Sequence, residues 1–422
     1  MSLPLVFTTP EDYFEACMEF LSHYRELYWR ANTDVLNDDL SFHTLVEDSV
    51  DLFMEEVKRL APRYEDFTSD NLQNVSSPMS RKKAHEVVHV NQAIHELCEE
   101  VGCRTVVDLG AGKGYIGVHM QEHYNYNVLG LELKPSLYVA AKVHQRKYHP
   151  TTLPTVKFKL HGVTEHSDMN ISTLLEDKFP QAKEFCFVGL HPCGDLTVDA
   201  MKLFLKMQDS RALMLTPCCY HKMAPATDNE IRFKNFPLSS TFKKIYEDFE
   251  GFEFLKAPFL RVASQPNCMK DDTDLRVFYL LARALLTVYA RKYSCKLKKT
   301  KRKALSCPTV KDFTTYVVEV AMKSYKLVPN YQKDDEKTIE FNQEELHSMW
   351  TNIPAHTFKN ASTYIKLQDE MPPVFENLIL YDRLQYLKEK GIRHCYYRKV
   401  VNEKISPKCL SLFACKDTLV PT

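Results

Sequence analysis

The sequence contains little glycine, only 11 residues in 422, against about 7% in an average protein. The first 101 residues contain none, and ten of the eleven lie between positions 102 and 251. This scarcity excludes collagen-like chains and glycine-rich low-complexity chains. A backbone needs glycine where it turns sharply or approaches a ligand closely. We therefore expect each of the few glycines to stand at such a position.

Long apolar runs and a regular cysteine framework are also absent. No run of about 18 apolar residues occurs, so neither a membrane-spanning helix nor a membrane partner is expected. The first ten residues lack a basic segment and are followed by Glu11 and Asp12, which does not fit a secretory signal. The 13 cysteines are irregularly spaced, as in chains with reduced thiols. We therefore expect a cytoplasmic or nuclear protein.

Acidic and basic residues balance over the whole chain but are unevenly spread. Residues 1–60 hold 13 acidic and four basic residues, whereas Arg291–Lys303 holds eight basic residues and no acidic one. This basic segment and the block Arg81–Lys83 are candidate contacts for RNA, and the acidic N-terminal helices are a candidate docking surface for a protein. Solvated surfaces, or a localisation signal within 291–303, explain the same charges.

Five short apolar segments after Gly102 are predicted to be strands, with helices between them. They are Thr105–Leu109, Tyr126–Leu133, Val156–Leu160, Phe185–Leu190 and Ala212–Thr216. This alternation predicts a parallel sheet with helices on both faces. A helix over Pro373–Lys390, ending at Gly391, and two strands over Arg393–Val401 and Lys408–Cys415 would complete a seven-stranded sheet. The alternative is a sheet that ends earlier in the chain, with Phe252–Leu255 and Val277–Leu281 as its last two strands.

The predicted fold class is therefore α/β, Rossmann-like, with seven strands. Residues 1–78 form an N-terminal helical region, and residues 79–220 form the first part of the sheet core. Residues 221–370 form a helical insert that carries the basic segment 291–303. Residues 371–422 supply the final helix and two strands. Helical spacing in the insert is clearest over Leu275–Arg291, Thr309–Tyr325 and Asn342–Trp350.

The clearest chemical signal is a strand that runs into a glycine-rich turn and then a helix, Val106–Gly114. Such a turn lets a ligand approach the free N–H groups of a helix N-terminus. A phosphate-binding P-loop sequence is absent, and the dinucleotide fingerprint would need a small residue where Tyr115 stands. The remaining pattern, Asp two residues before G-x-G-x-G, is that of methyltransferases that use S-adenosylmethionine. The predicted cofactor residues are Asp108, Gly110, Ala111, Gly112, Lys113 and Gly114.

Two further positions extend the predicted cofactor site. Glu132 ends the second strand, where a carboxylate can accept hydrogen bonds from both ribose hydroxyls. NAD would use such an acid in the same way, so Glu132 alone does not discriminate between the two cofactors. Gly162 and Val163 follow the third strand and are predicted to lie near the adenine.

Histidines and cysteines follow the fourth and fifth strands, at the edge of a parallel sheet where ligands bind. The predicted acceptor pocket comprises His191, Cys193, Asp195, Cys218, Cys219, Tyr220 and His221. His191 or His221 could act as a general base, Cys193 could act as a covalent nucleophile, and the cluster could bind zinc. Packing of the pocket floor is the fourth possibility. No metal ligands are predicted, since C-x-x-C is absent and adjacent cysteines are awkward joint ligands.

Five ordered blocks make the sequence similar to the methyltransferase-like protein 25 family, one branch of which is named rRNA adenine methyltransferase domain-containing protein. The blocks are Met79–Val87, Val107–Gly114, Gly189–Leu196, Pro217–His221 and Ser406–Leu412. Pro192 and Lys408 depart from the family, which often has Thr and Arg there. The resemblance implies a methyltransferase fold with a cofactor site at Asp108, Gly110, Gly112, Gly114 and Glu132.

The histidine–cysteine blocks also resemble those of acceptor-stem tRNA ribose methyltransferases, which favours RNA by analogy. The sequence thus predicts an enzyme, an S-adenosylmethionine-dependent methyltransferase acting on RNA. The alternatives are a protein methyltransferase and a catalytically silent module that binds the cofactor.

Overall fold

A computed structural model describes residues 4, 6–29, 32–36, 48–62, 64–65, 67, 78–226, 233–249, 257–265, 272–300, 310, 312–330 and 338–416. The chain divides into two compact units. Unit 1 comprises Met1–Ser22, Lys58–Cys268 and Pro372–Thr422, and unit 2 comprises His23–Val57 and Met269–Met371. These units differ from the segments predicted from the sequence, because residues 221–268 group with the sheet and residues 1–78 are shared between the units.

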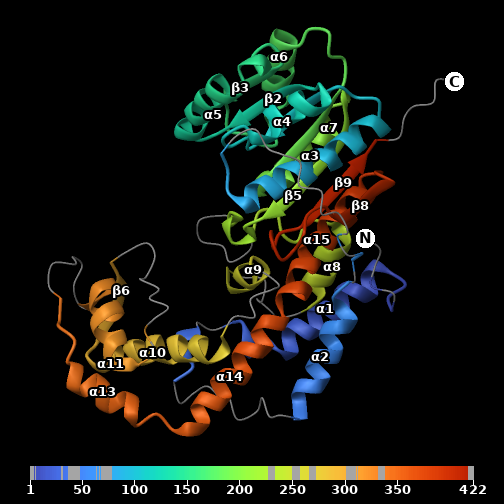
Figure 1. Ribbon diagram of the computed structural model, residues 1–422. Coiled ribbons are helices and arrows are strands. Elements are labelled where there is room, and N and C mark those ends of the chain that lie inside the picture. Colours follow the sequence, from blue (N-terminus) through green and yellow to red (C-terminus); the bar gives the residue numbers. More distant parts are fainter. Residues whose placement is uncertain are drawn as a thin grey trace. The chain divides into compact units, whose positions relative to one another are not determined.

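Unit 1 contains a seven-stranded sheet in the order β3-β2-β1-β4-β5-β9-β8 (Figure 1). The first five strands are parallel, whereas β9 pairs antiparallel with both β5 and β8. The strands are β1 Thr105–Leu109, β2 Asn127–Glu132, β3 Val156–Leu160, β4 Phe185–Cys193, β5 Ser210–Cys218, β8 His394–Lys399 and β9 Leu410–Cys415. The predicted fold class and all seven predicted strands are confirmed.

Helices cover both faces of this sheet. One face packs against α3 Arg81–Glu100, α4 Tyr115–Tyr124 and α5 Pro135–Tyr148, whose apolar residues form one core cluster with alternate residues of the strands. The helix α7 Leu196–Lys206 packs against β4 and β5 through residues outside that cluster, on the other face (Figure 1). Ser80 caps α3 by accepting a hydrogen bond from the Lys83 amide, as its position before an apolar-periodic segment predicts.

The last three elements complete the sheet as the sequence predicts. Helix α15 Pro372–Glu389 is followed by Gly391 at φ +86°, a left-handed conformation that favours glycine after a helix. The alternative closure is wrong where the structure describes it, because Val277–Leu281 lies inside a helix, and Phe252–Leu255 lies outside the described residues. Among the described residues outside Met269–Met371, the other α-helices are α1 Pro10–His23, α2 Asp48–Leu60, α6 Asp168–Lys178, α8 Ser240–Asp248 and α9 Ala257–Ala263.

Buried hydrogen bonds explain why residues just after 232 group with the sheet. The Asp382 carboxylate of α15 is fully buried and accepts hydrogen bonds from the Leu238 and Ser239 amides and from the Ser239 hydroxyl. This anchors the start of α8 to α15. Such a pairing of residues 143 apart cannot be anticipated from local periodicity.

Unit 2 is mostly helical, with α10 Thr273–Lys292, α11 Phe313–Tyr316, a π-helical turn Val317–Ala321, α12 Met322–Ser324, α13 Gln343–Thr351 and α14 Ala355–Glu370. It also contains a two-stranded antiparallel ribbon, β6 Cys295–Lys299 with β7 Tyr325–Pro329. The prediction of a helical insert did not include this ribbon. The ribbon forms because Cys295 and Leu327 are buried at the end of α10. Within the basic segment 291–303, Arg291 and Lys292 end α10 and Cys295–Lys299 form β6, while residues 301–303 lie outside the described residues. Among the helices described, none is both long and apolar enough to cross a bilayer.

Candidate cofactor and acceptor site

The glycine-rich turn between β1 and α4 has the backbone conformation that its sequence predicts. Gly110, Gly112 and Gly114 have φ values of +77°, +59° and +76°, in the left-handed region that side chains disfavour. The Gly110 and Ala111 amides donate to the Leu131 carbonyl, which ties the turn to the end of β2. Gly114 precedes α4 as its N-terminal cap, so the turn opens directly onto a helix N-terminus.

A cavity of about 550 Å³ lies beside this turn. Of the predicted cofactor residues, Asp108, Gly110, Ala111, Gly112 and Lys113 line it. Its other walls come from the start of α3, including Ser80 and Lys83, from Tyr115 and Ile116 of α4, and from Leu190 of β4. The cavity therefore has the size class of a small-molecule site and sits at the carboxyl edge of the central strands.

Asp108 is the acid at the centre of this site. Its side chain is only 2% exposed, and its Oδ2 atom has no hydrogen-bond partner among the described residues. Burial, together with the nearby Glu132 charge, raises the pKa of Asp108 to about 7, although Lys83 opposes the shift. A buried carboxylate oxygen without a partner is costly, so this position is suited to a cationic or hydrogen-donating ligand.

Glu132 holds the turn from the neighbouring strand. Its carboxylate accepts a hydrogen bond from the Gly112 amide at 2.9 Å and from the Lys134 amide at 2.8 Å. Each oxygen keeps a further lone pair, so the predicted ribose contact is compatible with these bonds. Gly162 and Val163 lie in the loop after β3, where His161 contacts the Ser167 hydroxyl at 3.0 Å. Glu132, Gly162, Val163 and Gly114 do not line the cavity itself.

The Phe158 ring of β3 explains two of the glycines. A Cβ atom at Gly130 would lie 2.6 Å from the Phe158 ring, and one at Gly114 would also collide with that ring. Glycine is therefore required at both positions for packing beneath the turn. The sequence predicted Gly114 as a ligand contact, and the structure adds this packing role.

His191 lies at an irregularity near the end of β4. The register between β4 and β5 shifts between Leu190 and Cys193, and His191 has a φ of +64°. Its Nε2 atom lies 3.0 Å from Oε1 of Glu86, a residue of α3 that is 1% exposed. A non-glycine residue in the left-handed region costs of order 1–3 kcal/mol and is found mainly at functional sites.

Glu86 connects this histidine to the cofactor cavity. Its carboxylate also contacts Lys83 at 2.6 Å and accepts a hydrogen bond from the Ser406 hydroxyl at 2.7 Å. Burial would raise its pKa, but the His191 and Lys83 contacts outweigh burial, and the pKa of Glu86 falls well below its usual range. Lys83 thus belongs to both the Glu86 network and the cavity wall.

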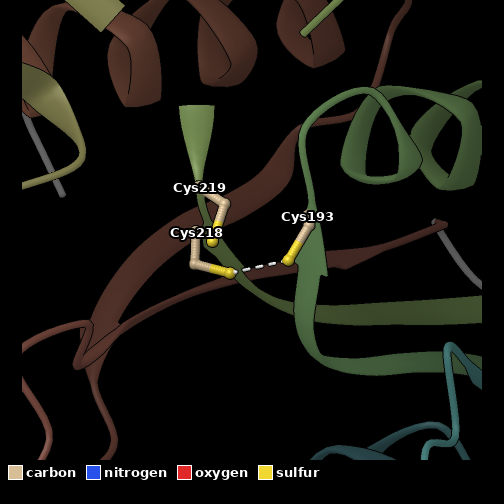
Figure 2. A group of neighbouring side chains, drawn as sticks. All are labelled: Cys193, Cys218 and Cys219. Carbon is tan, nitrogen blue, oxygen red and sulfur yellow. Dashed lines mark hydrogen bonds between the residues drawn. The ribbon is translucent and has the colours of Figure 1, made fainter. Parts of the chain in front are cut away.

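Cys193, Cys218 and Cys219 meet where β4 and β5 end (Figure 2). Their sulfur atoms all lie within 4.8 Å of one another, and Cys193 and Cys218 are 3.4 Å apart. The Cys218 contact, helped by Cys219, lowers the pKa of Cys193 to about 5 despite its burial, and the same contact raises that of Cys218. The structure therefore brings together three of the predicted acceptor residues, with His191 two residues before Cys193.

The other predicted acceptor residues are placed differently. Asp195 accepts hydrogen bonds from the Ala224 amide at 2.6 Å and from the Asn235 side chain at 2.9 Å, so its carboxylate anchors the segment after β5. Tyr220 is fully buried and donates to Glu376 of α15 at 2.8 Å. His221 is exposed, and its backbone amide donates to Ser264. These contacts give Asp195 and Tyr220 structural roles, while their predicted catalytic roles stay predictions.

The sequence reading missed Glu86 as a site residue, although it lies in one of the blocks that carry the family resemblance. The available signal was a lone acid within the apolar stretch of α3, where Glu86 precedes Val87 and Val88, both buried. An acid on an apolar helix face must have a partner. The partner itself, 105 residues away, was not visible in the sequence.

Residues 82–226 match a family of known proteins described as a methyltransferase domain. This stretch of the chain is similar to such a methyltransferase domain. The probable methyltransferase-like protein 25 of Mus musculus is 32% identical over 79 residues, which are 17% of this chain and 13% of that protein. Its Homo sapiens counterpart is 32% identical over 69 residues, 16% of this chain and 11% of that protein. The predicted family resemblance is confirmed over that segment, which spans about an eighth of these relatives' length.

Solved methyltransferase structures are also similar to part of the chain. The M. capricolum TrmK structure, a complex with S-adenosyl-homocysteine, is 10% identical over 30% of this chain and 50% of that chain, with a TM-score of 0.22. An RNA methyltransferase from Salinibacter ruber, also bound to S-adenosyl-L-homocysteine, is 17% identical over 36% of this chain and 84% of that chain, with a TM-score of 0.23. Likeness at this level supports no functional inference, so the description of the fold rests on the strand order of unit 1.

Proposed function

We propose that this chain is an S-adenosylmethionine-dependent methyltransferase that acts on RNA. The observation that carries the proposal is the buried Asp108 carboxylate, whose Oδ2 atom has no partner within the described residues and borders a cavity of about 550 Å³. The cofactor's amino-acid part carries an ammonium group that fits this carboxylate, because opposite charges attract strongly where water is excluded. The amides of the glycine-rich turn and Lys83 suit its carboxylate.

The remaining cofactor contacts follow the sequence prediction. Glu132 accepts hydrogen bonds from the ribose hydroxyls, and Gly162 and Val163 lie near the adenine. When bound, the cofactor supplies a methyl group on a sulfonium that is itself the leaving group. The chain's own task is therefore to orient the acceptor and keep water away from it.

His191 is the proposed general base. Glu86 holds its Nε2 atom at 3.0 Å, and its buried Nδ1 atom has no hydrogen-bond partner in the described part of the chain. A histidine held through one nitrogen by a carboxylate can take a proton at the other. Cys193 follows His191 by two residues on β4 and meets Cys218 and Cys219 at the end of β5.

RNA is favoured as the acceptor by the ribbon of unit 2. Lys298 of β6 stands directly opposite Lys326 of β7, and Lys296 is exposed on the same face of β6. A row of basic side chains on one face of a ribbon attracts a polyanion such as RNA. Arg81–Lys83, at the start of α3, is the second basic contact proposed for RNA.

A protein acceptor is the second candidate, and α1 provides the observation that favours it. Glu11, Asp12, Glu15 and Glu19 are all exposed on this helix, while the apolar residues between them are buried. Such an acidic stripe suits a basic protein partner. A third candidate, a silent module that binds the cofactor without transferring methyl groups, would share the cofactor site.

Transfer of a labelled methyl group separates these candidates. The full chain is incubated with labelled S-adenosylmethionine and with fractionated RNA and protein from cells that lack its gene. Label in the RNA pool, lost in Asp108→Ala, supports the proposal. Label in the protein pool alone contradicts RNA as the acceptor, and cofactor binding without label in either pool contradicts catalysis.

A further inference from the structure

The three thiols at the ends of β4 and β5 form a convergent group. Figure 2 shows the Cys193 and Cys218 sulfur atoms pointing toward each other, with the Cys219 sulfur beside that of Cys218. Cys193 and Cys219 are half-buried, and Cys218 is buried. All three sulfur atoms fall within 4.8 Å of one another. No other group of this kind is found among the residues that the structure describes.

Backbone geometry at both strand ends produces this convergence. Cys193 pairs with Cys218 in the sheet, after the register shift that follows Leu190. Cys219 then has a φ of +51°. This value lies in the left-handed region, which residues other than glycine seldom adopt. The turn at Cys219 brings two neighbouring thiols within reach of Cys193. This is why adjacent cysteines, which are awkward joint ligands when judged from the sequence, can act together here.

The spacing of the sulfur atoms matches one tetrahedral ion. With metal–sulfur bonds of about 2.3 Å, sulfur atoms on a tetrahedral zinc ion lie about 3.8 Å apart. The observed range, from 3.4 Å to within 4.8 Å, includes that value. A disulfide would need sulfur atoms about 2.05 Å apart and would leave the third thiol without a role. Lys222 acts electrostatically on Cys193 and would offset the negative charge of three thiolates.

We propose that Cys193, Cys218 and Cys219 together bind one thiophilic divalent metal ion, zinc being the most suitable, through three thiolates. Zinc fits because it accepts sulfur ligands in tetrahedral geometry. Three protein ligands leave the fourth position to water or to another donor, as in sites that are not purely structural. The site joins the end of β4 to the end of β5, and its first ligand follows His191 by two residues. Its existence does not depend on cofactor binding or on the identity of the methyl acceptor.

Metal content of the full chain is the first test. The chain is purified without chelators and without a metal-binding tag, and its zinc is measured by plasma mass spectrometry. We expect roughly one zinc ion per chain, and a loss of roughly tenfold or more in Cys193→Ser and in Cys218→Ser. The control is Cys415→Ser, which removes a half-buried thiol of β9 outside the cluster and should keep its zinc.

X-ray absorption at the zinc edge tests the same site without any variant that could fail to fold. The unmodified chain should show about three sulfur atoms at about 2.3 Å around the metal. A first shell of nitrogen and oxygen would overturn the proposal. So would zinc retained in both serine variants, a chain that stays metal-free after anaerobic loading with zinc, or a Cys193–Cys218 disulfide in protein purified under reducing conditions.

Discussion

The His191 side chain reaches the buried Glu86 carboxylate across 105 residues of sequence, with Nε2 and Oε1 3.0 Å apart. This contact joins the end of β4 to α3, whose first turn also forms part of the cofactor cavity through Lys83. A residue at the acceptor edge is thereby fixed to the wall of the cofactor site. Several properties of the chain should depend on this one carboxylate.

Replacing Glu86 by Gln should destabilise the chain at neutral pH, by about 3 kcal/mol, because it removes one partner of a buried ion pair. The pKa of Glu86 is lowered in the folded state, so its contribution is present above the unfolded value near 4.3 and is lost as pH falls below it. Urea unfolding between pH 3 and 7 should therefore show a difference that shrinks in acid. Methyl transfer should fall more than cofactor affinity.

Glu96→Gln on the same helix is the matched control for Glu86→Gln. Glu96 pairs with Arg398 at 2.9 Å, but both side chains are nearly half exposed, and such pairs contribute about 1 kcal/mol or less. Equal effects of the two substitutions would contradict the assigned role of the buried pair.

Replacing Asp108 by Asn should stabilise the chain without cofactor at pH 8. The folded-state pKa of Asp108 is raised from 3.8 to about 7, so ionisation opposes folding, and stability is lost as pH rises between these values. The shift corresponds to a penalty on the order of 4 kcal/mol at high pH. Thermal unfolding should show Asp108→Asn to be more stable at pH 8 and similar to the unmodified chain near pH 4. Identical curves at pH 8 would contradict the buried charge.

The affinity for S-adenosylmethionine should rise with pH. The ionised form of Asp108 attracts the cofactor's ammonium group, and a pKa of about 7 leaves half the carboxylates protonated at that pH. Calorimetric titrations should show binding that tightens by up to about tenfold per pH unit below pH 7 and levels off above it. Asp108→Asn should bind weakly at every pH. A flat profile for the unmodified chain would exclude titration of Asp108 from the binding step.

Gly130→Ala should destabilise unit 1 by about 1–3 kcal/mol, since its Cβ would lie 2.6 Å from the Phe158 ring. Combining it with Phe158→Leu should recover part of that loss. In the control, Gly391→Ala, no atom lies within 4 Å of the added Cβ, so its cost should simply add to that of Phe158→Leu. Denaturant unfolding of the three single and two double variants measures the coupling, and additivity in both pairs would refute the packing role.

Neutralising the ribbon with Lys296→Gln, Lys298→Gln and Lys326→Gln should weaken RNA binding and lower its salt dependence. Each phosphate contact contributes roughly 0.7–0.9 to the slope of log affinity against log salt. Fluorescence anisotropy with total tRNA should show a slope smaller by about 2. Arg146→Gln with Lys147→Gln, on the exposed side of α5, should change the slope less. An unchanged slope in the ribbon variant would show that the ribbon does not contact RNA phosphates.

Much of the sheet was predictable because each strand is a short apolar run between clear turn signals. The Asp108–Gly114 turn was predictable because glycine adopts its three positive φ values without strain. The ribbon of unit 2 was not, because β6 is rich in lysine and its partner lies about 30 residues further along the chain. Its strand character comes from the burial of Cys295 and Leu327, which only the tertiary structure reveals.

The candidate site divides in the same way. Residue spacing was enough to predict Asp108 and the glycine-rich turn as cofactor residues, because they are close together in the sequence. It also predicted that the histidine–cysteine motifs lie at one edge of the sheet. Long-range pairings then decided what each side chain does. Tyr220 bonds to Glu376, 156 residues away, and Cys193 meets Cys218 only because β4 and β5 are neighbours. No periodicity in the sequence encodes such pairings.

Calorimetric titration of the full chain with S-adenosylmethionine at pH 8 tests the central claim most directly. The unmodified chain and Asp177→Ala, which removes an exposed acid of α6, should bind about one cofactor each. Asp108→Ala should lose at least about tenfold in affinity, equivalent to 1.4 kcal/mol, and Gly110→Arg, at a φ of +77°, should lose more. No binding heat from the unmodified chain, or equal affinity in Asp108→Ala, would contradict the account.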